Sequence, residues 1–458
     1  MKKKIQTLLL VLAVSTLSAT AGGIMTNTNY HIAFDRMFAR GATFGIDAAY
    51  SNPAGLVWGY DGWQVSFNWQ HPTQNRDITT TTPMLGLMYG DQTHKFRGEA
   101  SAPFVPALFA SYHHDRWALS TMIGIVGSGG FVEYDEGVPM FNVLLGSMLY
   151  SKGIAPNQYE LSSQMKGKQY IYGGQINFAY KVLDCLSVGV GVRANYYDGY
   201  YQGHVIADNH PLLGKLVGLE LDVDQKGWGF APLVSVDYHN GPLTLAARYE
   251  FRTKLDIPNT ENVLKAEMGD GLKAAIMAAD PSGQTLAGIG QTLDAKMTPY
   301  KDGVKTRYDM PALLSVAAQY EFTPQLRAAV EYHFFDDKHA KMINDRQKEL
   351  SHGTHEFLVG AEYDINKMFT VSAGGQKTNY GMTDKFQTNT SFVCDSYSVG
   401  FGAAVNINEH VRLNASYFCS IYDDNKVSSD NYLQTGQAGT DVYSRTNSVF
   451  GVGIDYKF

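Results

Sequence analysis

The feature that most constrains the fold is an alternation of apolar and polar residues with a period of two, which recurs from residue 63 to the last residue. This period is typical of a β-strand that has one apolar face and one polar face. In the last run, one face is apolar and the other is small or polar, with Phe450, Val452, Ile454, Tyr456 and Phe458 opposed to Gly451, Gly453, Asp455 and Lys457. Fourteen such runs begin near residues 63, 104, 116, 168, 185, 228, 243, 308, 325, 355, 367, 392, 410 and 444. Each is long enough for a tilted membrane strand, which needs roughly ten residues.

The connections between these runs distinguish a membrane barrel from a soluble β-sandwich, whose strands would also alternate. Short turns near residues 114, 183, 240, 323, 366 and 408 alternate with long insertions at 71–103, 135–167, 201–226, 257–307, 336–354, 380–391 and 424–442. Tight turns on one rim and long loops on the other are typical of outer-membrane barrels. The sequence therefore predicts an all-β fold, a 14-stranded antiparallel transmembrane β-barrel with both ends at the periplasmic rim.

The first residues predict export. Lys2, Lys3 and Lys4 precede a short apolar stretch and an A-x-A site at residues 19–21, which together form a signal peptide at 1–21. That leader carries three of the 37 basic residues and none of the 44 acidic ones, so the remaining chain has 34 basic residues and a net charge of −10. This balance argues against a nucleic-acid partner. No later window has eighteen consecutive apolar residues, which excludes a helical membrane protein.

Residues 22–61 lack the alternation and mix glycine, alanine, asparagine and isolated aromatics. We expect this segment to fold only against something else, as an N-terminal hatch inside the barrel formed by residues 62–458. The hinge between the two is the motif Asn52, Pro53, Ala54 and Gly55.

Two further features bear on a route through the barrel. The third run is interrupted at Gly127, Ser128, Gly129 and Gly130, and glycine inside a strand marks a bulge or a close backbone approach. The bulge predicts either a lateral opening toward lipid or a simple bend in the wall. Residues 140–150, 212–221 and 263–279 are apolar stretches within long loops, predicted as short helices that either roof the barrel or form an exposed capture groove. The groove residues would be Leu212, Leu213, Leu216, Leu264, Ile276 and Met277.

These residues resemble the FadL family of outer-membrane transporters for long-chain fatty acids and other hydrophobic compounds, which includes aromatic hydrocarbon channels. The resemblance is carried by residues 47–55, which are similar to the family's hatch motif, and by Ala102-Pro103-Phe104-Val105-Pro106, Gly227-Trp228-Gly229-Phe230, Met310-Pro311 and the aromatic C-terminus. It implies a monomeric barrel with an internal hatch, a lateral exit at a kinked third strand, and ligand capture by the loops at 201–226 and 257–307. The apolar insertion at 135–167 departs from the pattern.

The expected function is passive uptake of a hydrophobic ligand across the outer membrane, with release into the membrane lipid and no cofactor. If the ligand is a carboxylate, Arg193, Arg248 and Arg327 are candidate anchors because each falls on the polar phase of its strand. The alternative is that each arginine pairs with a lumen acid such as Glu250 or Glu331.

Other classes of function have weaker support. An outer-membrane receptor or adhesin acting through its long loops, with haem as one conceivable ligand, is the main alternative, and an open diffusion porin is a third. Enzyme chemistry is not expected, because no helix pattern follows residues 127–130 as a nucleophile elbow requires. His113 and His114 lack a third ligand at metal spacing, so no metal site is expected.

Overall fold

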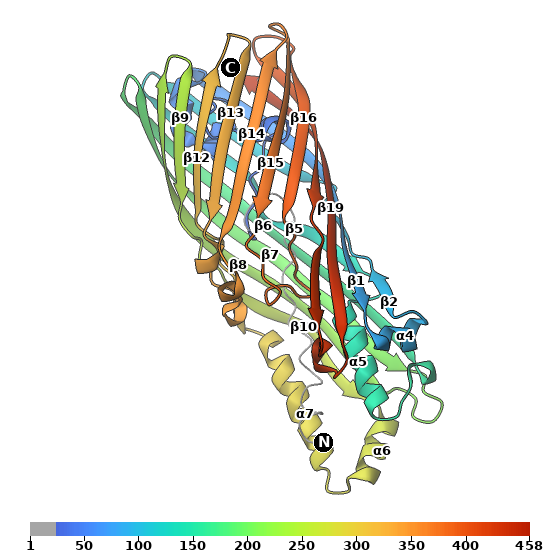
Figure 1. The fold of residues 1–458 in the computed structure, drawn as a ribbon. Coiled ribbons are helices and arrows are strands. Elements are labelled where there is room, and N and C mark those ends of the chain that lie inside the picture. The colour runs from blue at the N-terminus through green and yellow to red at the C-terminus, as the bar shows by residue number, and fades with distance from the viewer. Residues whose placement is uncertain (1–23) are drawn as a thin grey trace.

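The computed structural model describes residues 24–458, and the predicted signal peptide lies outside the described residues. Within that range, fourteen antiparallel strands form a closed barrel (Figure 1), which confirms the predicted fold class. The barrel closes where β1 pairs with β19, from Gln64 opposite Lys457 to Thr81 opposite Thr440. The wall strands are β1 (Gly62–Thr81), β4 (Val105–His114), β5 (Trp117–Tyr134), β6 (Glu160–Leu183), β7 (Leu186–Asp208), β8 (Val217–Asn240), β9 (Leu243–Glu250), β12 (Leu313–Glu321), β13 (Leu326–Phe335), β14 (Thr354–Asp364), β15 (Phe369–Asn379), β16 (Ser396–Asn406), β17 (Val411–Tyr422) and β19 (Gly439–Lys457).

The two rims of the barrel differ as the turn lengths predict. The short turns and the C-terminus lie at the rim drawn at the top of Figure 1, and the long connections leave the opposite rim. Five further strands extend the wall on the long-loop side: β2 (Thr93–Phe96), β3 (Glu99–Ser101), β10 (Asp256–Met268), β11 (Lys305–Arg307) and β18 (Asn425–Ser429). The same side carries α4 (Pro83–Tyr89), α5 (Pro139–Ser151), α6 (Asp270–Ala279) and α7 (Gln284–Met297), with short 3-10 turns η3 (Pro156–Gln158), η4 (Thr298–Tyr300), η5 (Asp337–His339), η6 (Ile343–Glu349) and η7 (Tyr432–Gln434).

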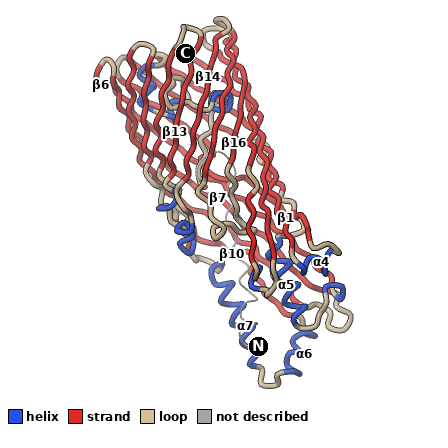
Figure 2. Tube along the Cα trace, viewed as in Figure 1, coloured by secondary structure: helices blue, strands red, loops and turns tan. Residues whose placement is uncertain are grey.

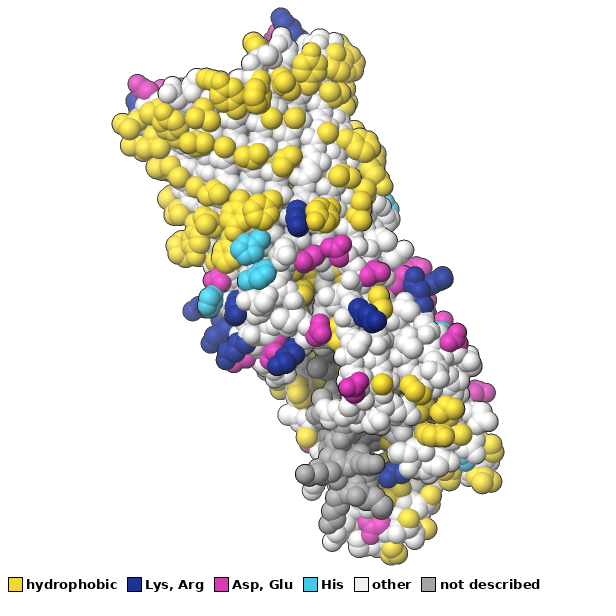
Figure 3. All heavy atoms as spheres, viewed as in Figure 1, with side chains coloured by type: hydrophobic (Ala, Val, Ile, Leu, Met, Phe, Trp, Pro, Cys, Tyr) yellow, Lys and Arg dark blue, Asp and Glu magenta, His cyan; other side chains and the backbone are white. Residues whose placement is uncertain are grey.

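The outer face of the wall is apolar near the short turns. Ile176, Val190 and Val359 are each more than half exposed although they lie in the middle of strands. On the face shown in Figure 3, apolar side chains gather over this half, and most charged side chains lie from about midway toward the other rim. Such a belt is what lipid contact requires of a barrel exterior. Among residues 24–458, no helix has the length and apolarity needed to cross a membrane.

The strands on one side of the barrel are longer than predicted, and this corrects the assignment of residues 212–221. That stretch is not a helix, because Val217–Leu221 forms the start of β8, paired on one edge with β7 and on the other with β10. The ladders on both edges satisfy the backbone hydrogen bonds of this segment. β6 likewise begins at Glu160 and not near residue 168, because its first residues pair with the end of β7.

The apolar stretch at 263–279 is half strand and half helix. Residues up to Met268 complete β10, and the helix α6 begins only at Asp270. The helix predicted at 140–150 is confirmed as α5, which packs against α4. Both helices contribute to an apolar cluster on the long-loop side, called the roof cluster below. The predicted 135–167 insertion is therefore a helix plus the first residues of β6.

Residues 24–58 lie inside the barrel, on the side of the short turns. They form the helices α2 (Ile32–Met37), α3 (Ala48–Ser51) and η2 (Pro53–Trp58), which Figure 2 shows enclosed by the strands. The wall is thinned to receive them, because methyl groups added at Gly360 or Gly374 would overlap the carbonyl oxygen of Met37. Glycine on the lumen face thus lets the hatch backbone lie directly against the strands.

Candidate functional site: a hatch and a gap in the barrel wall

The Asn52 to Gly55 motif fastens the hatch to the wall. The Asn52 amide donates to Asp237 Oδ2 at 2.9 Å, and the Ala54 amide nitrogen donates to Ser235 Oγ at 3.1 Å. The Ala54 carbonyl in turn accepts from Ser187 Oγ at 2.7 Å. Pro53 opens η2 at a position where no backbone donor is needed. The motif therefore anchors one end of the hatch to β7 and β8.

Wall carboxylates hold the other parts of the hatch. Glu331 on β13 accepts hydrogen bonds from the backbone nitrogens of Arg40 and Gly41, both at 2.8 Å. Arg36 of α2 forms a buried ion pair with Glu362 on β14 and donates to Ser372 Oγ at 2.7 Å. Buried charges of this kind are stable only when paired, so the hatch and the wall complete each other.

The three candidate anchor arginines all face the lumen and all engage carboxylates. Arg193 and Arg248 both pair with Glu250, and both guanidinium groups lie against the ring of Tyr50 in the hatch. Arg327 pairs with Glu362 and with Asp364 at 2.7 Å. Glu331, the other partner considered from the sequence, contacts His333. These contacts favour the pairing alternative, and a ligand-anchoring role for the three arginines stays a prediction.

The barrel wall has a gap where the glycine run interrupts β5. On the short-turn side of the gap, β4 pairs with β5 up to Ala107 opposite Gly124; on the long-loop side, β3 pairs with β5 from Ser101 opposite Phe131. Between these points, residues 102–106 and 125–130 form no ladder pairs with each other. Pro103 and Pro106 contribute to this, since proline has no amide hydrogen to donate. The register of β5 against β6 also shifts twice between Ile125 and Gly130, as expected of a bulge.

The hatch takes over the hydrogen bonds that the wall does not make at this point. The Asn27 backbone nitrogen donates to the Val126 carbonyl at 3.1 Å, and its side-chain amide donates to the Ile125 carbonyl at 3.2 Å. The Tyr30 hydroxyl donates to the same Val126 carbonyl at 3.3 Å. The N-terminal part of the hatch therefore seals the gap from the inside.

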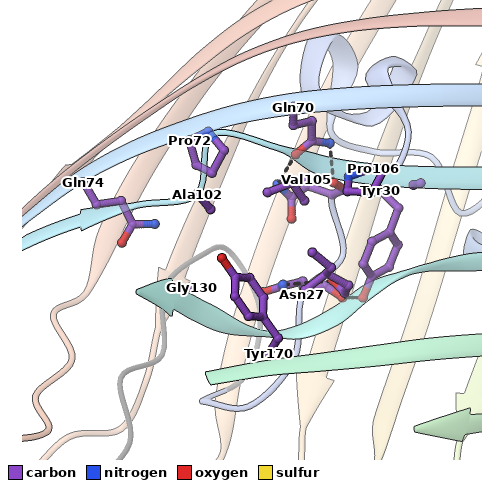
Figure 4. A pocket seen from close by; sticks show the side chains of 13 residues that line it. Asn27, Tyr30, Gln70, Pro72, Gln74, Ala102, Val105, Pro106, Gly130 and Tyr170 are labelled. Atoms are coloured by element: carbon purple, nitrogen blue, oxygen red, sulfur yellow. Dashed lines mark hydrogen bonds between the residues drawn. The ribbon is translucent and has the colours of Figure 1, made fainter. Parts of the chain in front are cut away.

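A narrow pocket lies at this gap (Figure 4). One side is formed by the β3–β4 segment and the other by β5 and β6, and residues of the hatch form its floor. Its lining residues are Asn27, Asn29, Tyr30, Gln70, Pro72, Gln74, Ala102, Val105, Pro106, Ala107, Ile125, Gly130 and Tyr170. The lining is mostly apolar at the wall and polar at the hatch and β1.

Two of the four predicted gap residues have local reasons to be glycine. A methyl group at Gly127 would overlap the Met25 carbonyl oxygen, so the hatch backbone lies directly against the wall here. Gly130 has a φ of 81°, a left-handed conformation that side-chain-bearing residues rarely adopt. Ser128 and Gly129 continue β5 between them. The glycine run thus combines a bulge with a close contact to the hatch.

A long loop fastens the start of the described chain. Asp337 in η5 accepts from the Ile24 backbone nitrogen at 3.2 Å and from the Thr354 hydroxyl at 2.6 Å. Burial raises the pKa of the Asp337 carboxyl to about 6, against the opposing effect of these hydrogen bonds. The hatch is therefore tied to the long-loop side of the barrel by a titratable group.

The predicted capture residues do not gather in one place. Leu216 is fully buried in the roof cluster, and Leu213 packs against the same cluster. Leu264 instead packs against a separate cluster that contains Tyr201. Leu212 is 89% exposed, and Met277 on α6 is exposed. The capture role of Leu212, Leu213, Leu216, Leu264, Ile276 and Met277 stays a prediction.

Sequence reasoning missed the residues that the gap and the hatch share. Asn27 carries no motif and acquires its role only because β5 bulges beside it. Glu362 and Asp337 were not singled out either, although the polar phase of β14 placed Glu362 in the lumen. The period of two could have identified Glu362, but not Asn27.

Comparisons with known proteins agree with this architecture. Residues 272–458 match the family model described as the outer membrane protein beta-barrel domain. No curated protein sequence matched the chain.

Three solved structures have a similar fold. A Pseudomonas aeruginosa FadL homologue is 16% identical, with 97% of this chain and 100% of that chain covered and a TM-score of 0.65. The P. putida toluene transporter TodX is 14% identical over 90% of this chain and 94% of that chain, with a TM-score of 0.56. The Ralstonia pickettii toluene transporter TbuX is 13% identical over 94% of this chain and 98% of that chain, with a TM-score of 0.54. The partial family match and these likenesses agree on the fold, a closed antiparallel β-barrel of the kind found in outer-membrane proteins.

Proposed function

We propose that this protein takes up hydrophobic compounds across the outer membrane without an energy source. The single observation that carries the proposal is the wall gap between β3–β4 and β5, which is sealed from inside by Asn27 of the hatch. The hatch fills the lumen along the barrel axis, whereas the barrel wall is interrupted at its side. This interruption offers an apolar solute a route into lipid. The solved proteins of similar fold include two toluene transporters, which supports the same class of cargo.

The driving force follows from the cargo. Apolar compounds cross the polar outer surface of the membrane poorly, and each methylene group transferred to lipid lowers the free energy by about 0.8 kcal/mol. Capture at the long-loop rim, passage to the pocket of Figure 4 and lateral release would therefore run downhill. The protein would act as a monomer, with membrane lipid as the acceptor of its cargo.

A receptor or adhesin is the second candidate. It has one observation in its favour: α6 buries none of its residues, and the α6–α7 hairpin projects beyond the sheet on the long-loop side (Figure 1). Binding of oleate, toluene and haem to the purified protein, together with liposome swelling in small sugars, separates the candidates. The transporter binds the apolar compounds and passes no sugar; a receptor for haem binds haem alone, and a porin passes sugar.

The gap itself is tested by a pair of glycine substitutions. Gly127→Ala should push the Met25 segment away from the wall, because the added methyl overlaps a backbone oxygen. Overpacking of this kind costs roughly 1–3 kcal/mol, so we expect uptake of toluene and oleate into proteoliposomes to rise several-fold.

Gly174→Ala is the matched control. It lies on β6 close to the bulge, and its methyl would meet open space. Uptake by this variant should equal that of the parent protein. A rate for Gly127→Ala that is unchanged or slower would show that the hatch does not gate the gap.

A further inference from the structure

Gln74 on β1 is a buried polar side chain at the pocket in the barrel wall. It lines this pocket (Figure 4), and only 6% of its surface is exposed. Within residues 24–458, its side-chain oxygen Oε1 has no hydrogen-bond partner. An amide oxygen that is taken out of water without a donor raises the free energy of the folded protein. A ligand that donates a hydrogen bond at this point would remove that cost.

Gln74 differs in this respect from the other glutamine of the pocket. Gln70 lies on the same face of β1, and its amide donates to the Asn29 carbonyl at 2.5 Å. The Asn29 side-chain amide donates back to Gln70 Oε1 at 3.2 Å. The hatch therefore satisfies Gln70 and leaves the oxygen of Gln74 to another partner.

The neighbour of Gln74 across the barrel seam is a second acceptor. Gln74 is paired with Asn447 of β19, whose Oδ1 is also buried without a hydrogen-bond partner in the described part of the chain. The Asn447 amide nitrogen donates to Ser420 Oγ at 3.5 Å. Directly opposed residues of a ladder have Cβ atoms about 5 Å apart, so the two side chains are close together. Both present an acceptor oxygen that needs a donor.

The size and direction of the pocket limit what can supply that donor. Its volume is about 40 Å³. Since a water molecule needs roughly 10–15 Å³ of such space, the pocket has room for a small polar group and not for a whole hydrocarbon chain. Gln74 lies on the lumen face of β1, whereas Tyr170 shares the outer face of β6 with the exposed Tyr172. Figure 4 shows Gln74 and Tyr170 on different sides of the pocket, so a head group at Gln74 would have its chain directed toward lipid.

We propose that Gln74 selects cargo with a neutral hydroxyl head, such as a long-chain alcohol, and that the chain of this cargo leads out through the wall gap. A hydroxyl both donates and accepts hydrogen bonds, so it can satisfy an amide in a pocket whose lining residues carry no charge. A pure hydrocarbon leaves the Gln74 oxygen unpaired, and a carboxylate offers it no donor. The proposal rests on the proposed uptake function and narrows its cargo to amphiphiles that carry an O–H group.

The test compares 1-dodecanol with methyl undecyl ether, which has the same number of heavy atoms but no O–H group. Calorimetry on the purified protein in a non-ionic detergent gives the ratio of the two affinities, alcohol over ether. In Gln74→Leu, which keeps a side chain of similar size and removes the amide, this ratio should fall roughly three- to tenfold, the value of a neutral hydrogen bond. The unfolding free energy of this variant should not fall, because the substitution removes an unpaired buried oxygen.

Gln319→Leu is the matched control. Gln319 on β12 is equally buried, and its Oε1 also lacks a partner within the described residues, but it does not line the pocket. The affinity ratio of this variant should equal that of the parent protein. A ratio that is unchanged in Gln74→Leu, or that falls equally in both variants, would overturn the selection at Gln74 and leave uptake intact. Failure of both ligands to bind to the parent protein would instead refute the uptake function.

Discussion

The buried arginines on the two sides of the hatch differ in whether a carboxylate neutralises them. In the half filled by the hatch, Arg36, Arg193, Arg248 and Arg327 each lie against a carboxylate. On the other side of the hatch, Arg445 is as deeply buried and forms no ion pair among the described residues. The first half is built to hold a segment of the protein in place. Both halves also contain buried polar atoms without a hydrogen-bond partner among the described residues, such as Asn52 Oδ1 in the first and Arg445 Nε in the second.

The largest effect should come from the ion pair that holds α2. Glu362→Gln leaves Arg36 buried without a matching charge, which typically costs about 3–5 kcal/mol. Urea unfolding in detergent micelles measures the loss. Glu409→Gln, at an exposed turn, is the control and should change the unfolding free energy little. Equal stability of the two variants would mean that the filled half is not held by its charges.

The loop contact to the start of the hatch should depend on pH. Because the pKa of Asp337 in the folded protein is about 6 and its ordinary value is 3.8, its contribution to stability is complete below about pH 4 and is lost as the pH rises through 6. The change amounts to at most about 3 kcal/mol. The unfolding free energy of the parent protein minus that of Asp337→Asn, followed from pH 4 to pH 7, should fall across this window. A flat difference would contradict the raised pKa.

The paired arginines of the filled half offer a direct contrast with Arg445. Arg248→Ala removes the hydrogen bonds to Glu250 and to the Tyr50 carbonyl, and should lower the unfolding free energy by about 2 kcal/mol. The Arg248→Ala variant should nevertheless bind dodecanoate and dodecanol with the same ratio of affinities as the parent protein. If this ratio falls in Arg248→Ala, the anchor role predicted from the sequence would be restored and the contrast between the halves would fail.

The smallest effect concerns the seal at the gap. Asn27→Ala removes the side-chain hydrogen bond to the Ile125 carbonyl and keeps the backbone bond to Val126, a loss of about 1 kcal/mol. Hydrogen exchange of the backbone amides in residues 24–30 should become about fivefold faster. Exchange at α2 should not change, since its contacts to β14 and β15 are untouched. Equal exchange in residues 24–30 of both proteins would place the seal elsewhere.

The sequence predicted those parts of the fold that repeat. Alternation with a period of two located all fourteen wall strands, because lipid and lumen impose opposite chemistry on successive residues. It failed for the ends of β6 and β8, because there both faces leave the lipid and the contrast disappears. The wrong prediction of a helix at 212–221 has the same cause. Leu219 and Leu221 suggested the apolar face of a helix, but they belong to the first part of β8.

The site was predictable only where one stretch of chain determines it. The glycines at 127–130 and the Asn52 to Gly55 motif are local, and both lie at contacts between hatch and wall. The partners of the arginines depend on which strands become neighbours and in which register. Arg76 and Arg445 are far apart in the sequence and meet only when β1 closes on β19. No local pattern contains that information.

The most direct test of the account is to trap the cargo on its way. A dodecanoate analogue with a photoreactive group at the chain end would be bound, illuminated, and mapped by mass spectrometry of peptides. The account predicts adducts on the lumen-facing pocket residues Tyr30, Gln70 and Gln74, which lipid outside the wall does not touch. Adducts confined to the long loops or to the short-turn rim, with none on these three residues, would contradict lateral passage through the gap in the wall.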